Sequence, residues 1–230
     1  EKNLQQHFGG DVTNPLNRST LFALSFIGIV ILTGLGVLAK IDQGGWIVAN
    51  RITSDSADFL ASGITLLGDM EPTGLITLVL AVLGWHDRGW RGLVPLLLFA
   101  GVALEILLKC YLPHPGPPVS RQLWHPPYNV PIEYLDNLIG LTLHGSVPFQ
   151  GIQYSFPSGH VFRTTFLAEF AGGCLNCCPS VGRGLIVAMA LTRIYLGEHW
   201  VSDVVGGLLL GLFCASIASV LYRAGQPAQP

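Results

Sequence analysis

The sequence predicts an all-α, polytopic membrane protein with six transmembrane helices in one bundle. Composition is the first observation behind this prediction: 50% of the 230 residues are hydrophobic, only 11% are charged, and mean hydropathy is +0.51. A soluble globular domain carries about 25% charged residues. The second observation is that apolar residues gather in stretches, several of them close to the ~20 residues that a membrane span needs. Polar, glycine-rich or proline-rich segments separate these stretches.

Six apolar stretches are candidate spans, and residues 1–230 are interpreted as one transmembrane domain. The second stretch is short unless it begins upstream, where the half-polar segment 52–67 is interpreted as an outer helix that leads into it. The fourth begins with proline, which is tolerated at the first helical position. The six are Leu21 to about Ile41, about Pro72 to Trp85, Leu93 to Leu112, Pro157 to near Cys178, Gly184 to about Leu196, and Val201 to Tyr222.

Besides the short turns between spans, the chain has an N-terminal segment 1–20, a long loop 113–156 and a tail 224–230. Within the loop, apolar residues at helical spacing predict a helix over 132–143. Two interpretations of this helix stay open. It is either an interfacial helix that lies on the bilayer or a lid that packs on the spans.

Arginines predict the orientation in the membrane. Five arginines lie before the first span, in the turns after the second and fourth spans, and after the sixth span, all on one side of the membrane. The positive-inside rule makes this side cytoplasmic. The bias is modest, because Lys40, Arg51 and Arg121 fall on the other side. We expect a multi-pass protein of a bacterial inner (plasma) membrane, with its active site at the outer membrane interface. The arginines on the predicted inner side are Arg18, Arg88, Arg91, Arg183 and Arg223.

Net charge bears on the expected partners, and cysteine content bears on disulfide bonds. Net charge is −2, so nucleic acid is not an expected partner. The five cysteines lie in or at the ends of apolar stretches, which predicts no disulfide framework.

Two histidine motifs carry the chemistry. His199 and Asp203 are four residues apart, so on a helix they share a face. A carboxylate beside a histidine fixes the tautomer of the ring and prepares it as a nucleophile or a base. His160 follows Pro-Ser-Gly at a predicted helix start, where backbone N–H groups bind anions. Together with Arg193, these groups indicate phosphoryl chemistry.

Lys109, at the outer end of the third predicted span, is a further candidate residue of the same site. Both histidine motifs fall on the same side of the membrane as this lysine, so functional groups converge there from separate spans. Glu105 lies one helical turn before Lys109 and is its predicted ion-pair partner.

These residues resemble the type-2 phosphatidic acid phosphatase superfamily, whose motifs are K-x6-R-P, P-S-G-H and S-R-x5-H-x3-D. The second motif is intact at 157–160. The third is intact over 193–203, with Thr192 in place of the serine. The first departs from the pattern: six residues after Lys109 come Gly116 and Pro117, so glycine stands where the family has arginine.

The resemblance implies a role for each residue. His199 would be the nucleophile that forms a phosphohistidine, and Asp203 would orient it. His160 would protonate the leaving oxygen and then deprotonate the attacking water. The family needs no metal, and we expect no metal and no other cofactor. The groups expected to hold the phosphoryl oxygens are the Lys109 and Arg193 cations, the Ser158 hydroxyl and the Gly159 N–H.

Arg163 is a further candidate for phosphate binding, because the arginine expected at position 116 is missing. It follows His160 by three residues, and helical side chains lean toward the N-terminus, so its guanidinium is able to reach the phosphate pocket. The other interpretation is an ion pair with Glu105 at a similar depth in the third span. The two interpretations do not exclude each other.

Three functional hypotheses follow. The first is an integral-membrane phosphatase that acts on a lipid phosphate or diphosphate of the phosphatidic acid, phosphatidylglycerol phosphate or polyprenyl diphosphate type. The second is a lipid phosphotransferase that uses the same intermediate. The third is a catalytically weak membrane scaffold of the same fold. The lipid head group, chain length and oligomeric state stay open.

Overall fold

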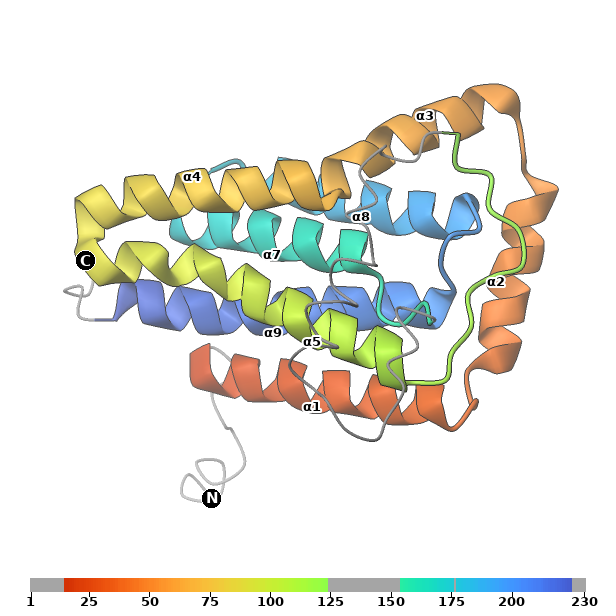
Figure 1. Cartoon of the computed structure of the whole chain (residues 1–230), viewed down its shortest axis with the longest axis horizontal. Helices are drawn as coiled ribbons and strands as arrows, with labels where there is room; N and C mark the ends of the chain where they lie inside the picture. Colours follow the sequence, from red (N-terminus) through yellow and green to blue (C-terminus); the bar gives the residue numbers. More distant parts are fainter. Residues whose placement is uncertain (1–14, 124–153, 176, 225–230) are drawn as a thin grey trace, which may run out of the picture.

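The computed structural model describes residues 15–123, 154–175 and 177–224, and every element in them is helical. Figure 1 shows an elongated bundle with two shorter helices at one end. The shorter helices are α2 (Ala39–Arg51) and α3 (Asp55–Thr65), and 3₁₀ turns η1 (Leu66–Gly68) and η2 (Gly89–Leu96) flank α4. The long helices are α1 (Pro15–Gly34), α4 (Met70–Arg88), α5 (Leu97–Tyr111), α7 (Gly159–Cys174), α8 (Pro179–Tyr195) and α9 (Val201–Arg223).

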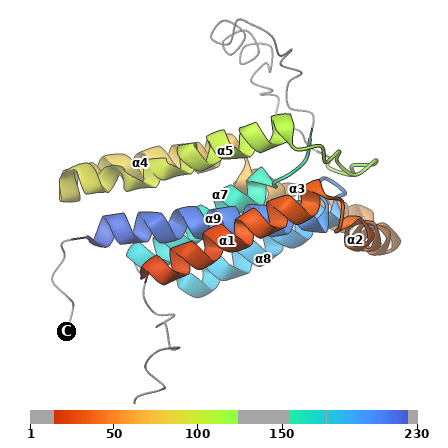
Figure 2. The ribbon, with the colours of Figure 1, turned by 90° about the horizontal axis from the view of Figure 1, so that it is seen from below.

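Helices α7 and α9 form the centre of the bundle. Helix α1 packs on α9 and α8 packs on α7, while α4 and α5 lie as a pair on the other side, as Figure 2 shows. The central pair approaches closely because α9 carries glycine there: a Cβ atom on Gly207 would lie 2.3 Å from the Ser158 carbonyl oxygen. Small residues allow such backbone contact between membrane helices. The close contact fixes the start of α7, and therefore His160, against α9.

The structure confirms an all-helical membrane fold. By length and composition, three stretches of the described chain are suited to crossing a membrane: Asn17–Gly34, Asp55–Tyr111, which runs from α3 through α5, and Val201–Arg223. Helices α7 and α8 are shorter, at 16 and 17 residues. Each of the six predicted spans has a long helix in its place, with shifted ends.

The predicted first span, Leu21 to about Ile41, extends too far. Helix α1 ends at Gly34, and Gly36 takes a left-handed conformation with φ +69°. The Leu35 N–H bonds to the Ile31 carbonyl and the Gly36 N–H to the Thr33 carbonyl, so the last turn closes on itself. The chain then turns into α2, which crosses the end of the bundle in Figure 1 and for which the sequence predicted no helix.

Other helix boundaries also differ from the prediction. The outer helix predicted over 52–67 is confirmed as α3, with Ser54 as its N-cap. Helix α7 begins at Gly159, not at Pro157, and Ser158 is its N-cap residue. Helix α8 begins at Pro179, five residues before the predicted start at Gly184. The helix predicted over 132–143 lies outside the described residues.

Candidate active site

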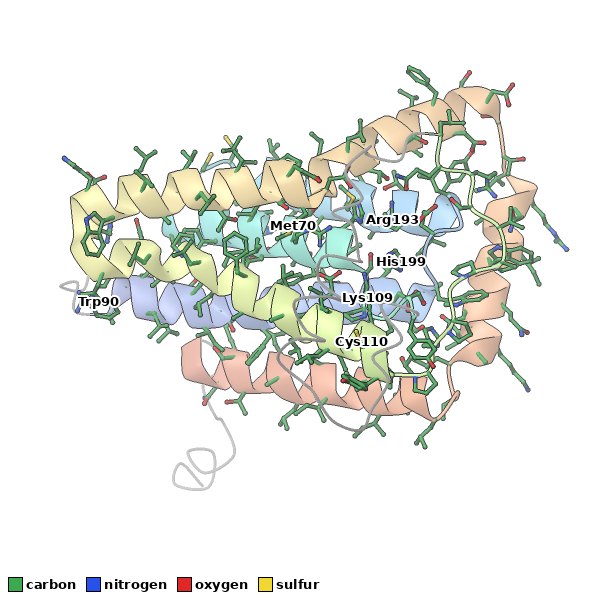
Figure 3. All side chains as sticks on the ribbon, in the orientation of Figure 1. Met70, Trp90, Lys109, Cys110, Arg193 and His199 are labelled. Atoms are coloured by element: carbon green, nitrogen blue, oxygen red, sulfur yellow. The ribbon has the colours of Figure 1, made fainter. Side chains whose placement is uncertain are left out.

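The predicted site residues lie at the end of the bundle that carries α2. They come from the last turn of α5, the first turns of α7 and α9, the last turn of α8 and the short turn between α8 and α9. Figure 3 shows the labelled side chains of Lys109, Arg193 and His199 near one another, with Trp90 at the far end. His160 is close enough to Lys109, Arg163, Arg193 and His199 to interact with them electrostatically.

His199 and Asp203 form the predicted pair. The Nδ1 atom of His199 lies 3.2 Å from Oδ2 of Asp203, which is fully buried. The same Oδ2 accepts a hydrogen bond from the Trp200 backbone N–H at 2.9 Å, as an acid at the third helical position does when it reaches back to the N-cap. Because Nδ1 faces the carboxylate, Nε2 is the nitrogen left for chemistry.

The environment of His199 favours the nucleophilic form of its ring. Burial lowers the pKa of His199 below its ordinary value, while the hydrogen bond and charge of Asp203 oppose this effect. The imidazole is therefore neutral near pH 7, with a lone pair on Nε2.

Further polar side chains surround Asp203. The Nε2 atom of His114 lies 3.2 Å from Oδ1 of Asp203 and 3.2 Å from the Ser202 hydroxyl. Asp42 on α2 accepts hydrogen bonds from both the backbone N–H and the hydroxyl of Ser202, each at 2.8 Å. The contacts of Asp42 connect α2 to the start of α9. Besides His199, each oxygen of the Asp203 carboxylate has one more partner: the Trp200 N–H at Oδ2 and His114 at Oδ1.

His160 faces a carboxylate from another helix. Its Nε2 atom lies 2.7 Å from Oδ1 of Asp69, the residue that begins α4. Both side chains are mostly buried, with 17% and 10% exposed. Each of the two motif histidines, His160 and His199, therefore has its own aspartate.

A buried chain of ion pairs links α5 and α7 beside the histidines. Lys109 donates to Glu105 Oε1 at 2.8 Å, and Arg163 Nη1 lies 3.3 Å from Glu105 Oε2. Arg163 also donates from Nε and Nη2 to the Gly68 carbonyl, at 3.1 and 2.9 Å. The ion pair predicted between Arg163 and Glu105 is thus present, and all three guanidinium nitrogens have protein acceptors.

The glycine of the P-S-G-H motif is required by this network. A Cβ atom on Gly159 would lie 2.0 Å from Glu105 Oε1 and 2.7 Å from Arg163 Nη1. Only hydrogen fits between the start of α7 and the ion pairs. The backbone N–H of Gly159 is one of the orphan donors at a helix start, which suits an anion.

Two further donors of the predicted phosphate site lack partners. In the part of the chain that the structure describes, neither the Ser158 hydroxyl nor Arg193 Nε has a hydrogen-bond partner, although both atoms are buried. The remaining nitrogens of Arg193 bond to Gln122 at 2.8 Å and to Glu198 at 3.3 Å. Buried donors without partners are costly unless a ligand satisfies them.

Sequence reasoning missed four polar residues of the site: Asp42, Asp69, His114 and Ser202. Two signals were available. Asp69 stands shortly before the second predicted span and Asp42 directly after the first, and acids next to apolar spans are usually paired or functional. Their partners are remote in sequence, so spacing alone does not reveal them. Among the described residues, no group of three or more His, Cys, Asp or Glu side chains is placed to hold a metal ion.

The motifs and the fold place the chain in a known family. The sequence model of the PAP2 superfamily matches residues 92–226, so the chain belongs to that superfamily. All three motifs lie within the matched segment. The fold agrees: a transmembrane PAP2-type phosphatidylglycerolphosphate phosphatase from Bacillus subtilis superposes with a TM-score of 0.70, at 20% identity, over 92% of this chain and 99% of that one.

Two curated relatives match shorter segments. The YbjG protein of Escherichia coli (strain K12), whose name marks it as a candidate undecaprenyl-diphosphatase, is 37% identical over 71 residues, which are 30% of this chain and 36% of that protein. A decaprenylphosphoryl-5-phosphoribose phosphatase of Mycobacterium tuberculosis (strain ATCC 25618 / H37Rv) is 38% identical over 78 residues, 34% of this chain and 41% of that protein. The matches therefore span well under half of these relatives.

Proposed function

We propose that the chain is a membrane phosphatase that hydrolyses a lipid phosphate or diphosphate through a phosphohistidine on His199. The observation that carries the proposal is the pair of His–Asp contacts beside buried cations and unpartnered donors. A nucleophile oriented by a carboxylate, an acid–base group and an anion site are the parts that stepwise phosphoryl transfer needs.

In the first step, Nε2 of His199 attacks phosphorus and the bond from phosphorus to the leaving oxygen breaks. His160 gives a proton to that oxygen. Asp203 stabilises the positive charge that develops on the His199 ring. The donors of Lys109, Arg193, Ser158 and Gly159 hold the other phosphoryl oxygens, whose charge rises in the transition state.

In the second step, water replaces the imidazole on phosphorus. His160, now neutral, takes a proton from the water as its oxygen attacks. The phosphorus–nitrogen bond breaks, and inorganic phosphate and free His199 result. The same histidine thus serves as acid and then as base, and the enzyme returns to its starting protonation state.

A lipid substrate is supported by the surroundings of the site. An apolar cavity of about 460 Å³ lies between α2, α3 and α8, with Ala49, Ala61 and Thr192 in its wall. Thr192 is adjacent in sequence to the phosphate-site residue Arg193, so the cavity lies at the same level along α8 as the phosphate site. Among the lipid classes, polyprenyl phosphates are favoured, because both curated relatives are named for such substrates.

The test of this function is phosphate release from defined lipids in detergent. We expect purified protein to release inorganic phosphate from farnesyl diphosphate, undecaprenyl diphosphate or phosphatidic acid with a chelator present, and vanadate to inhibit, because it mimics the five-coordinate transition state. Transfer to an added alcohol without release would identify a phosphotransferase. An absolute requirement for a divalent metal would contradict the mechanism.

We further propose six membrane spans and an active site that opens to the outer face. The support is the charge distribution: the arginines near the starts of α1 and α8 and the ends of α4 and α9 lie at the end of the bundle away from His199. Cys177 and Cys178 are exposed in the turn between α7 and α8 and report on the inner side.

Thiol labelling tests this orientation. Cys110 is half-buried at the outer end of α5, so the experiment uses a Cys110→Ala background throughout. An impermeant maleimide should leave this protein unlabelled in intact cells and label it after permeabilisation. The variant Asp55→Cys, at an exposed position at the start of α3, should label without permeabilisation. The opposite pattern would reverse the topology.

For the missing first-motif arginine, we propose that Arg163 supplies the compensating positive charge. A variant pair tests this. Arg163→Gln should lower kcat, because it removes a positive charge beside the proposed phosphate site. Adding Gly116→Arg should restore part of that loss, and a Cβ atom at this position is tolerated, because it would lie in ordinary contact with Ser155 at 3.5 Å. A lowered melting temperature with unchanged turnover per folded molecule would show that Arg163 only stabilises the fold.

A further inference from the structure

Asp69 offers a carboxylate that the three sequence motifs do not include. It lies outside residues 92–226, the segment matched by the family, and reaches the site from the start of α4. Its Oδ1 atom is 2.7 Å from Nε2 of His160, the shorter of the two His–Asp contacts, since His199 and Asp203 are 3.2 Å apart.

The position of Asp69 shows that this contact is not a by-product of helix capping. Asp69 is the N-cap residue of α4, where an aspartate ordinarily accepts a hydrogen bond from the second or third backbone N–H of the helix. Here the side chain makes no such bond, and only its backbone carbonyl serves the helix, by accepting from the Thr73 hydroxyl at 2.6 Å. The carboxylate is directed to His160 instead.

The turn that carries Asp69 is held against α7. Arg163, one helical turn after His160, donates two hydrogen bonds to the carbonyl of Gly68. Gly68 itself has no room for a side chain: a Cβ atom there would lie 2.8 Å from Met189 Cε and 3.1 Å from His160 Cβ. The Gly68 backbone therefore packs directly against His160. The hydrogen bonds from Arg163 on α7 fix the position of this backbone.

From this geometry, and resting on the proposed phosphatase function, we propose that Asp69 is the positioning residue of the acid–base histidine. By accepting the Nε2–H of His160, it fixes the ring so that Nδ1 carries the transferred proton. In the first step, the Nδ1 proton moves to the leaving oxygen as the bond between phosphorus and that oxygen breaks. In the second, Nδ1 takes a proton from water as the new bond to phosphorus forms. Asp69 keeps its own charge throughout.

The consequence is a dependence on the leaving group. Farnesyl phosphate and farnesyl diphosphate carry the same hydrocarbon chain. The first must expel an alkoxide unless an acid protonates it, whereas the second expels a phosphate, which is a far weaker base. Loss of assistance from His160 therefore slows the first substrate much more than the second.

The decisive variant is Asp69→Asn, measured on both substrates. We expect kcat/KM on farnesyl phosphate, which reports formation of the phosphoenzyme, to fall ~100-fold, and kcat/KM on farnesyl diphosphate to fall less than about tenfold. With farnesyl diphosphate the phosphoenzyme should accumulate, because water activation is also slowed. In a His160→Ala background the change at Asp69 should have no further effect, as expected for residues that act through one group.

Asp87→Asn is the matched control, since it removes the acid of an exposed His–Asp pair, His86 and Asp87, 3.3 Å apart at the other end of the bundle. It should leave both rates unchanged. Should Asp69→Asn fail to fold, Asp69→Ser keeps a favourable N-cap residue and repeats the comparison.

Equal losses on the two substrates, or a further loss in the His160→Ala background, would overturn the role of Asp69 while the phosphatase activity stands. A wild-type protein that hydrolyses neither substrate would overturn both proposals.

Discussion

Replacing His199 with alanine should abolish turnover while the protein stays folded. The side chain is the only part of His199 that the mechanism uses, and without a nucleophile no phosphoenzyme forms. We expect phosphate release to fall by ~10⁴-fold or more, as for loss of a nucleophile in other covalent mechanisms. Phosphate release from farnesyl diphosphate, with a melting curve for the same preparation, measures both parts of this prediction.

The control for His199→Ala is His86→Ala. His86 is 90% exposed and lies near the end of α4, at the opposite end of the bundle. Its replacement should change neither activity nor melting temperature. Near-normal phosphate release by His199→Ala would remove the basis of the proposed mechanism.

Replacing Asp203 with asparagine should lower kcat by ~10³–10⁴-fold with little change in KM. Asparagine fills the same space, but its amide N–H₂ placed against Nδ1 favours the tautomer with hydrogen on Nε2, which is not nucleophilic. If the amide instead keeps its oxygen at the Oδ2 position, which both the Trp200 N–H and Nδ1 of His199 contact, the tautomer is retained but the negative charge that stabilises the imidazolium is lost, so the rate falls in either orientation. Steady-state kinetics on folded protein measure the effect.

Asp42→Asn is the matched comparison for Asp203→Asn. Asp42 is 3% exposed and joins the same polar cluster through Ser202, but it is bonded to Ser202 and not to His199. We expect a loss of less than about tenfold in kcat, since its effect on His199 passes through two other residues. Equal losses in the two variants would mean that Asp203 matters for the fold of the cluster and not for the tautomer of His199.

Much of the fold follows from sequence because the signal is local. Apolar stretches predicted where the long helices lie, and the spacing of His199 and Asp203 predicted a contact within one helical turn. The break after Gly34 was harder to predict, since the apolar pattern continues into α2. Only the left-handed conformation at Gly36 shows where the chain turns.

The site was predictable only in part, for a related reason. Contacts at three or four residues along a helix, such as Glu105 with Lys109, can be inferred from spacing. The contact between Asp69 and His160 joins residues 91 positions apart, and the one between Asp42 and Ser202 joins residues 160 apart. Such pairs depend on how α2 and α4 pack against α7 and α9, which no local pattern specifies.

The proposed function depends most directly on the covalent intermediate. Rapid mixing of the protein with farnesyl diphosphate labelled in its terminal phosphate, followed by an alkaline quench and peptide mapping, shows where the phosphoryl group resides. We predict a label that is stable in alkali, is lost in acid, lies on the peptide containing His199, and is absent from His199→Ala. A label that survives acid, or one on another residue such as Ser158, would contradict the account.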